Sequence, residues 1–181
     1  MNLIWRTLLV FLFPRTDPAE PLDVVSKTFR VLPTDIDLYR HMNNGRYMSI
    51  ADVARVELIR RRGIWKELKA KGWYPIVAGS TINYRKSLDL WQKYEIQTRL
   101  AGVDGSDIYV EQRFVVRGEI YARFFVRIRF LARSGGRAPI DELSTLWGIE
   151  PGSFTPPAWL TDLTKESALP STREPAPSEW D

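Results

Sequence analysis

Apolar and polar side chains alternate along most of the middle of this 181-residue chain. The alternating apolar positions are Ile82, Tyr84 and Leu88, then Tyr94 to Leu100, Ile108 to Val116 and Ile120 to Phe130. A period of two predicts β-strands that each present one apolar face. Turn signals at Asp104-Gly105 and Gly118 leave connections so short that neighbouring strands must be antiparallel.

One amphipathic helix is predicted ahead of these strands. Its apolar positions lie three, four and four residues apart, at Tyr47, Ile50, Ala54 and Leu58. Asn43 or Asn44 can cap its start, and Gly63 can end it. The charged pairs expected on its wet side are Asp52 with Arg55 and Glu57 with Arg61. Because no other long apolar helix is available to cover the sheet, we expect an α+β fold in which a long, curved antiparallel sheet wraps around this helix.

Three segments are expected from the composition. Residues 1–22 are a hydrophobic N-terminal segment and a proline-containing linker, residues 23–150 form the folded domain, and residues 151–181 are an acidic, proline-rich tail without regular structure. The apolar run Met1–Phe13 is too short to span a bilayer and is interrupted by Arg6. Two interpretations stay open: this run packs on the body or on a partner subunit, or it contacts a membrane surface. The expected location is the cytoplasm, with membrane association as the alternative.

The charge and the rare residue types restrict the chemistry. The chain has no cysteine and one histidine, His41, so we expect no metal and no cysteine nucleophile. Residues 1–150 carry 24 Lys and Arg against 17 Asp and Glu, which makes the body basic. Coenzyme A, nucleic acid and anionic lipid all suit such a body, but no nucleic-acid-binding signature is present, so we expect no nucleic-acid partner. The arginines Arg123, Arg127 and Arg129 are expected on a solvated edge or a dimer surface.

Residues 34–47 hold the densest group of reactive side chains. Two carboxylates, the single histidine and two asparagines occur within ten residues, in a loop that opens onto the predicted helix. A carboxylate there can act as a base or a nucleophile, and free amides at the helix start can stabilise an oxyanion. The same residue types are also ordinary turn and capping residues.

This segment resembles the signature of hotdog-fold thioesterases. The residues that carry the resemblance are the run Asp35-Ile-Asp-Leu-Tyr-Arg-His-Met-Asn-Asn-Gly-Arg-Tyr47, the continuation Ala51–Arg55, and the later segments Tyr84–Leu88 and Tyr109–Glu111. They are similar to the 4-hydroxybenzoyl-CoA thioesterase-like class, and within it to the thioesterase superfamily member 6 group. The resemblance implies a five-stranded hotdog sheet and a homodimer or higher homo-oligomer. It also implies acyl-CoA or acyl carrier protein substrates bound at the subunit interface, a role in lipid metabolism, and no cofactor.

The resemblance also assigns roles to individual residues. It implies catalytic roles for Asp37, His41 and Asn43 and substrate-binding roles for Asn44 and Gly45. Arg40 and Tyr39 depart from the family pattern, and we expect them to contact the substrate. Asp37 would attack the thioester or activate water, and amides near Asn44 and Gly45 would polarise its carbonyl. Arg40 stands where hydroxybenzoyl-CoA enzymes have glycine, and Tyr39 stands where plant-type acyl carrier protein thioesterases have asparagine. We therefore expect an acyl-CoA thioesterase, with a non-catalytic acyl-binding protein of the same fold as the alternative.

Overall fold

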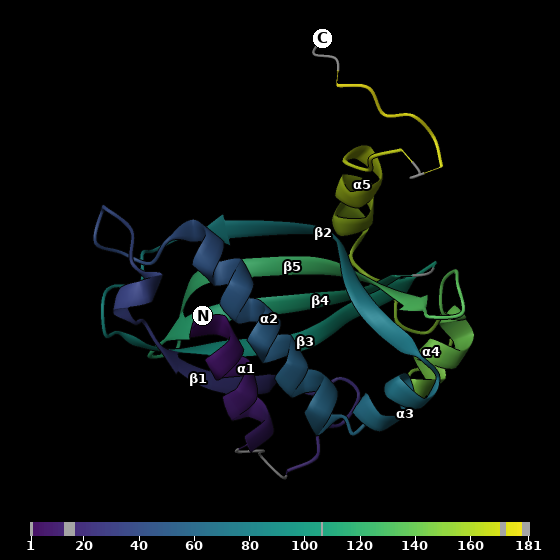
Figure 1. Cartoon of the computed structure of the whole chain (residues 1–181), viewed down its shortest axis with the longest axis horizontal. Coiled ribbons are helices and arrows are strands. Elements are labelled where there is room, and N and C mark those ends of the chain that lie inside the picture. The colour runs from purple at the N-terminus through teal and green to yellow at the C-terminus, as the bar shows by residue number, and fades with distance from the viewer. Residues whose placement is uncertain (1, 13–16, 106, 171–172, 179–181) are drawn as a thin grey trace.

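Five antiparallel strands form one curved sheet, and the longest helix lies across one of its faces (Figure 1). The computed structural model describes residues 2–12, 17–105, 107–170 and 173–178. The strands are β1 (Val25–Arg30), β2 (Trp73–Tyr84), β3 (Lys93–Asp104), β4 (Asp107–Val116) and β5 (Glu119–Ala132). Their order in the sheet is β1-β3-β4-β5-β2. The predicted α+β architecture is confirmed.

Tight turns set the register of the long strands. Val116 pairs with Glu119 across a two-residue turn in which Arg117 and Gly118 both have positive φ. Such a turn matches the right-handed twist of the strands it joins. The predicted turn at Asp104-Gly105 lies between β3 and β4, where Asp104 pairs with Asp107 and Gly105 has positive φ. The chain's turn residues therefore specify an antiparallel sheet, as predicted.

The central helix α2 (Asn44–Arg61) begins at the predicted cap. Asn43 is the N-cap residue, and its side-chain oxygen accepts a hydrogen bond from the Gly45 amide. The predicted apolar positions Tyr47, Ile50, Ala54 and Leu58 are all buried against the sheet. Gly63, with positive φ, follows the C-cap residue Arg62. The helix is therefore the cover that the apolar face of the sheet requires.

Two charged residues of α2 are not on the wet side. Glu57 is fully buried and receives Lys27 Nζ of β1 at 3.2 Å, whereas Arg61 pairs with Asp17. The predicted pair of Glu57 with Arg61 is therefore wrong. The helix is buried over a wider surface than its apolar stripe, because β1 also covers the side that carries Glu57. Arg55 does pair with Asp52, but burial lowers the pKa of the Arg55 guanidinium to about 10.

The N-terminal helix α1 (Asn2–Leu12) packs beside α2. Val10 is buried, and its carbonyl accepts a hydrogen bond of 2.5 Å from Arg60 Nη1 of α2. The packing interpretation is thus confirmed for the inward side of α1. Its outward side exposes Ile4, Trp5, Leu8 and Leu12. Met1 and residues 13–16, which belong to the predicted N-terminal segment and linker, lie outside the described residues. No helix among the described residues is long and apolar enough to cross a membrane.

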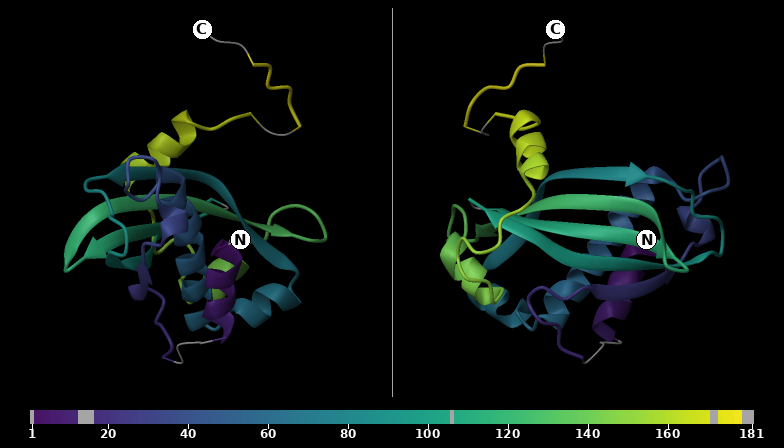
Figure 2. Two further views of the ribbon diagram at one scale, coloured as in Figure 1. Left: turned by 60° about the vertical axis from the view of Figure 1, so that its left-hand side comes forward. Right: turned by 180° about the vertical axis from the view of Figure 1, so that it is seen from behind.

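The proline-rich tail contains a helix, so the expectation of an unstructured tail is wrong over this stretch. After α3 (Trp65–Ala70) and α4 (Ile140–Leu146), the chain crosses the face of the sheet opposite α2 and forms α5 (Ala158–Glu166) (Figure 2). Leu160 of α5 is buried with Ala101, Tyr109 and Phe125 of the sheet, and Trp159 packs edge-on against the Phe125 ring. We call residues 150–166 the C-terminal segment.

Arginines on this outer face of the sheet pair with two carboxylates. Arg123 contacts Glu111 at 2.7 Å, and Arg127 and Arg129 contact Asp107. Glu111 also receives Arg99 and Arg113, each at 2.7 Å. Because β5 lies between β4 and β2, these arginines do not occupy an edge of the sheet, so the edge alternative is wrong and the dimer surface stays a prediction.

Candidate functional site

The predicted reactive residues lie on a small hairpin that leads into α2. We call residues 36–42 the site loop. Ile36 pairs with Met42 at its base, and the Asp37 amide donates to the His41 carbonyl at 3.1 Å. The Arg40 amide donates back to the Asp37 carbonyl at 3.1 Å, which closes a tight turn. Arg40 has φ +66°, a conformation that favours glycine. This is the position where the resembled hydroxybenzoyl-CoA enzymes carry glycine.

Three predicted site residues meet on this hairpin. Asp37 Oδ1 accepts a hydrogen bond of 2.9 Å from the Tyr39 amide, which fixes the carboxylate against its own loop. Asp37 Oδ2 lies 3.7 Å from His41 Nδ1, which is too far for a hydrogen bond. The Tyr39 ring stacks on the His41 ring with centroids 6.1 Å apart. The Asp37 carboxylate is thus oriented and still partly accessible.

The other predicted residues lie at the start of α2. Asn43 caps the helix with its side chain, and the Gly45 amide is the donor in that cap, at 2.9 Å. The Asn44 amide has no hydrogen-bond acceptor among the described residues. The Asn44 carbonyl accepts a hydrogen bond from the Tyr84 hydroxyl of β2 at 3.2 Å. Of the two amides expected to hold an oxyanion, only the one at Asn44 is therefore free.

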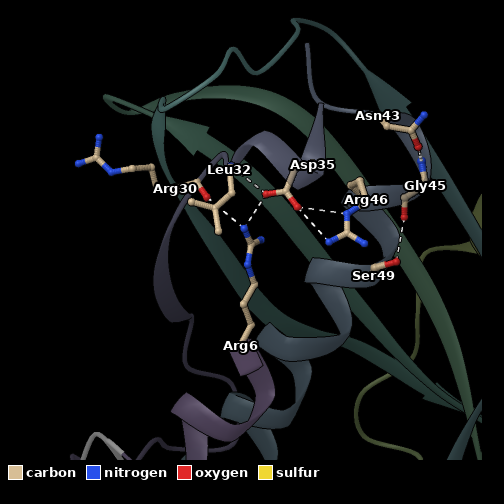
Figure 3. Close-up of polar contacts among 8 residues, drawn as sticks. All are labelled: Arg6, Arg30, Leu32, Asp35, Asn43, Gly45, Arg46 and Ser49. Atoms are coloured by element: carbon tan, nitrogen blue, oxygen red, sulfur yellow. Dashed lines mark hydrogen bonds and ion pairs between the residues drawn. The ribbon is translucent and has the colours of Figure 1, made fainter. Parts of the chain in front are cut away.

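A buried carboxylate that the sequence did not single out anchors the loop. Asp35 is fully buried, and Figure 3 shows Arg46 of α2 donating to its Oδ1 from two nitrogens, at 3.1 and 3.0 Å. The Leu32 amide donates to Asp35 Oδ2 at 3.0 Å, and the Asn43 amide donates to the Asp35 carbonyl at 2.9 Å. The sequence did contain a signal for this anchor, because Asp35 is the other carboxylate of the motif and lies two residues before Asp37.

The far side of the loop is tied to the segment between β2 and β3. The Met42 amide donates to the Leu88 carbonyl at 2.8 Å, and the Leu88 amide donates to the Tyr47 hydroxyl at 3.3 Å. Burial raises the pKa of Tyr47 to about 12, although the hydrogen bond from Leu88 acts in the opposite direction. Tyr47 is therefore a neutral structural group at ordinary pH.

Comparison with known proteins identifies the family. The model described as the thioesterase-like superfamily matches residues 31–148. The chain belongs to the thioesterase-like superfamily. The matched region of this thioesterase-like chain begins directly after β1 and ends just beyond α4, and it contains every predicted site residue.

Individual proteins agree with this assignment. Protein THEM6 from Xenopus laevis is 44% identical over 112 residues, which are 61% of this thioesterase-like chain and 54% of the relative. The chain thus spans about half the length of the curated relatives it matches. The probable thioesterase YbaW from Escherichia coli superposes with a TM-score of 0.64 at 20% identity, over 67% of this chain and 94% of that structure. The hypothetical protein SAV2348 from Staphylococcus aureus, solved in complex with CoA, gives 0.61 at 15% identity, over 80% and 96%. The predicted resemblance and the hotdog fold are confirmed.

A wide groove among the described residues lies away from the site loop. It has a volume of about 1400 Å³ and runs between α5 and the outer face of β2 and β5, where Ile76, Arg127 and Leu163 line it. None of the predicted site residues lines it. Across the described ranges, no three His, Cys, Asp or Glu side chains are grouped so that they could hold a metal ion. The tip of the site loop lies on the surface, since Leu38 and Tyr39 are 98% and 82% exposed.

Proposed function

We propose that this chain hydrolyses acyl-CoA thioesters to a free acid and CoA. The observation that carries the proposal is the Asp37 carboxylate, held by the Tyr39 amide and partly accessible, on the hairpin that leads into the 18-residue helix α2. Membership of the thioesterase-like superfamily supports the reaction class.

Asp37 acts as the base or the nucleophile of this reaction. As a base it takes a proton from water while the water oxygen bonds to the thioester carbon. As a nucleophile it bonds to that carbon itself, and water later hydrolyses the acyl-enzyme. In both routes the carbon–sulfur bond breaks and the leaving thiolate is protonated. His41, at 3.7 Å from Asp37, positions the water or the substrate.

The oxyanion donor in this proposal is the Asn44 amide. It lies in the first turn of α2, where the helix dipole favours negative charge, and it has no acceptor among the described residues. The Gly45 amide is engaged by the Asn43 side chain. Asn43 therefore contributes by fixing the start of the helix, and Gly45 by leaving space at the cap.

Acyl-CoA is the substrate class we favour over an acyl carrier protein. The body of the chain is basic, and the CoA nucleotide carries several phosphate charges. Arg40 stands at the exposed tip of the site loop, where its guanidinium can reach a phosphate, and the exposed Tyr39 ring can pack on the substrate. The CoA complex of the similar Staphylococcus aureus protein adds support.

A homodimer completes the site in this proposal. β2 is an outer strand of the sheet, and Tyr74, Ile76 and Val77 along it are exposed. An edge with these properties is suited to pair with the same strand of a second copy. Sedimentation equilibrium should then give at least twice the 21.0 kDa chain mass, and a strictly monomeric mass would exclude the dimer.

The α1 helix favours peripheral membrane contact as a second property. Its outward side presents four large apolar side chains, Ile4, Trp5, Leu8 and Leu12, to solvent. Apolar side chains on one side of a helix bind the boundary between lipid headgroups and acyl chains. We propose that this surface binds bilayers, where acyl substrates concentrate.

The test of the main proposal is thiol release from short, medium, long and aromatic acyl-CoAs. Asp37→Asn should lower turnover by at least about 100-fold, the scale of a lost general base. The matched control is Asp89→Asn, which removes the same charge from an exposed residue whose backbone pairs with His41. Equal turnover in both variants would contradict the role of Asp37. Acyl-CoA binding without turnover would favour the non-catalytic alternative.

A further inference from the structure

A buried arginine in the N-terminal helix reaches the site loop. Arg6 occurs in an otherwise largely apolar helix, yet it is only 9% exposed and points inward. Its Nη2 donates to Asp35 Oδ2 at 2.5 Å and to the Arg30 carbonyl at 3.3 Å (Figure 3). Twenty-nine residues separate Arg6 from Asp35 in the sequence. The helix therefore places a charge beside the carboxylate that anchors the loop.

This arginine is costly to bury, so packing alone does not explain it. A buried guanidinium loses its hydration, and a methionine or leucine would fill the same space without that penalty. Arg6 Nη1 is buried without a hydrogen-bond partner among the described residues. What Arg6 provides in return is a short charge-assisted hydrogen bond to Asp35.

Asp35 transmits this contact to the site. Its side chain joins α1 through Arg6, α2 through Arg46 and the segment after β1 through the Leu32 amide. Its carbonyl holds the Asn43 amide at the cap of α2. Asp35 is therefore connected to both parts of the site, since Asp37 follows two residues later in the chain and the Asn44 amide follows Asn43.

We propose that Arg6 is a positioning residue for the thioesterase site and acts through Asp35 to hold the site loop against the start of α2. The proposal rests on the proposed function and deepens it, because it makes the N-terminal helix part of the catalytic unit. Small displacements matter at such a site, since a misplacement of about 1 Å can cost about 100-fold in rate.

Two variants of α1 contacts separate positioning from packing. Arg6→Met removes the charge and keeps the side-chain stem. Arg60→Met is the matched control, because Arg60 holds α1 through the Val10 carbonyl at 2.5 Å and no contact with Asp35 is found for it among the described residues. Both variants are compared with the wild type at a temperature where all three are folded.

We expect Arg6→Met to lower kcat by at least about 10-fold with little change in KM, because Arg6 orients the site rather than binding substrate. Arg60→Met should stay within about twofold of the wild type, and Arg6→Lys should recover part of the lost kcat by restoring the charge. An equal kcat in Arg6→Met and Arg60→Met would overturn the proposal. If Arg6→Met does not fold, Arg6→Gln replaces it, because glutamine keeps hydrogen-bond donors but lacks the charge: a reduced kcat supports the proposal and a wild-type kcat overturns it.

Amide hydrogen exchange tests the positioning without any turnover. The Leu32 and Asn43 amides both donate to Asp35, so they should exchange faster in Arg6→Met and at the wild-type rate in Arg60→Met. Unchanged exchange in Arg6→Met would overturn the positioning role. Should the wild type hydrolyse no thioester, the proposed function fails, and the exchange result still decides whether Arg6 holds the loop.

Discussion

Adding one methyl group at Gly102 should displace the C-terminal segment from the sheet. Gly102 has φ +146° at an irregularity in the pairing of β3 with β4. A Cβ atom there would lie 2.2 Å from the backbone nitrogen of Pro156, 2.5 Å from its Cα and 2.6 Å from its Cδ. These atoms belong to a rigid residue, so no side-chain rotation can relieve the overlap. Gly102→Ala therefore forces either the strand or the segment to move.

The structure sets the size of the loss. The unfavourable φ costs about 1–3 kcal/mol. Displacing the segment also loses the burial of Leu160, about 1.5–3 kcal/mol, and the hydrogen bond of 2.8 Å from the Val103 amide to the Phe154 carbonyl, about 1 kcal/mol. The conformational freedom that the released segment regains offsets part of this sum. We expect the free energy of unfolding to fall by about 3–5 kcal/mol.

Urea unfolding measures this loss, with Gly105→Ala as the control. Gly105 also has positive φ, at +57°, but nothing lies within 4 Å of the added Cβ, so its variant should lose only about 1–2 kcal/mol. Trypsin should cut at Lys165 in α5 faster in Gly102→Ala than in Gly105→Ala. Equal unfolding free energies in the two variants, within about 0.5 kcal/mol, would refute the reasoning.

Two further predictions concern the charged outer face and the apolar side of α1. Burial alone would raise the pKa of Glu111, but hydrogen bonds from Arg113, Arg99 and Arg123 lower it below its usual value. The ionised form therefore stabilises the fold above about pH 4 and ceases to do so as the pH falls through the lowered pKa. Glu111→Gln should cost about 1–3 kcal/mol at pH 7, with a difference from the wild type that disappears in acid, whereas a difference independent of pH would contradict it. Leu8→Ser should weaken co-sedimentation with phosphatidylcholine–phosphatidylglycerol vesicles, whereas Leu163→Ser, equally exposed at 41% on α5, should not. Equal binding of these two variants would exclude α1 as the membrane contact.

The fold was predictable because its determinants are local. Three local patterns determine it: the alternation in the strands, the turn residues with positive φ and one apolar helical stripe. Each of them extends over a few neighbouring residues, so each could be recognised in the sequence. The helix α5 was not readable, because prolines dominate its surroundings. Its stability comes from Trp159 and Leu160 against Phe125, a contact with a distant strand.

The burial of charged side chains was not predicted either, because it too depends on contacts with distant residues. Each buried charge is hydrogen-bonded to a residue far away in the sequence. Glu57 accepts from Lys27, thirty residues away, Arg55 donates to Gln112, fifty-seven residues away, and Arg6 donates to Asp35. From the local sequence alone, a charged side chain is expected on the solvent-exposed side of a helix. Its burial is possible only when a partner from a distant segment offsets the desolvation cost. In the sequence, Arg6 was therefore interpreted as an interruption of an apolar run. In the structure it connects that run to the site.

The departures from the family pattern at Tyr39 and Arg40 do not displace Asp37. The site loop is fixed at its base, by Ile36 with Met42, by Met42 with Leu88 and by the Asp35 contacts. Tyr39 touches Asp37 through its backbone amide, which any residue but proline provides. Arg40 adopts a backbone conformation that favours glycine, yet its amide still closes the turn onto Asp37. The side chains at the tip are thus free to differ, and in the proposed function their exposure lets them contact an incoming acyl-CoA.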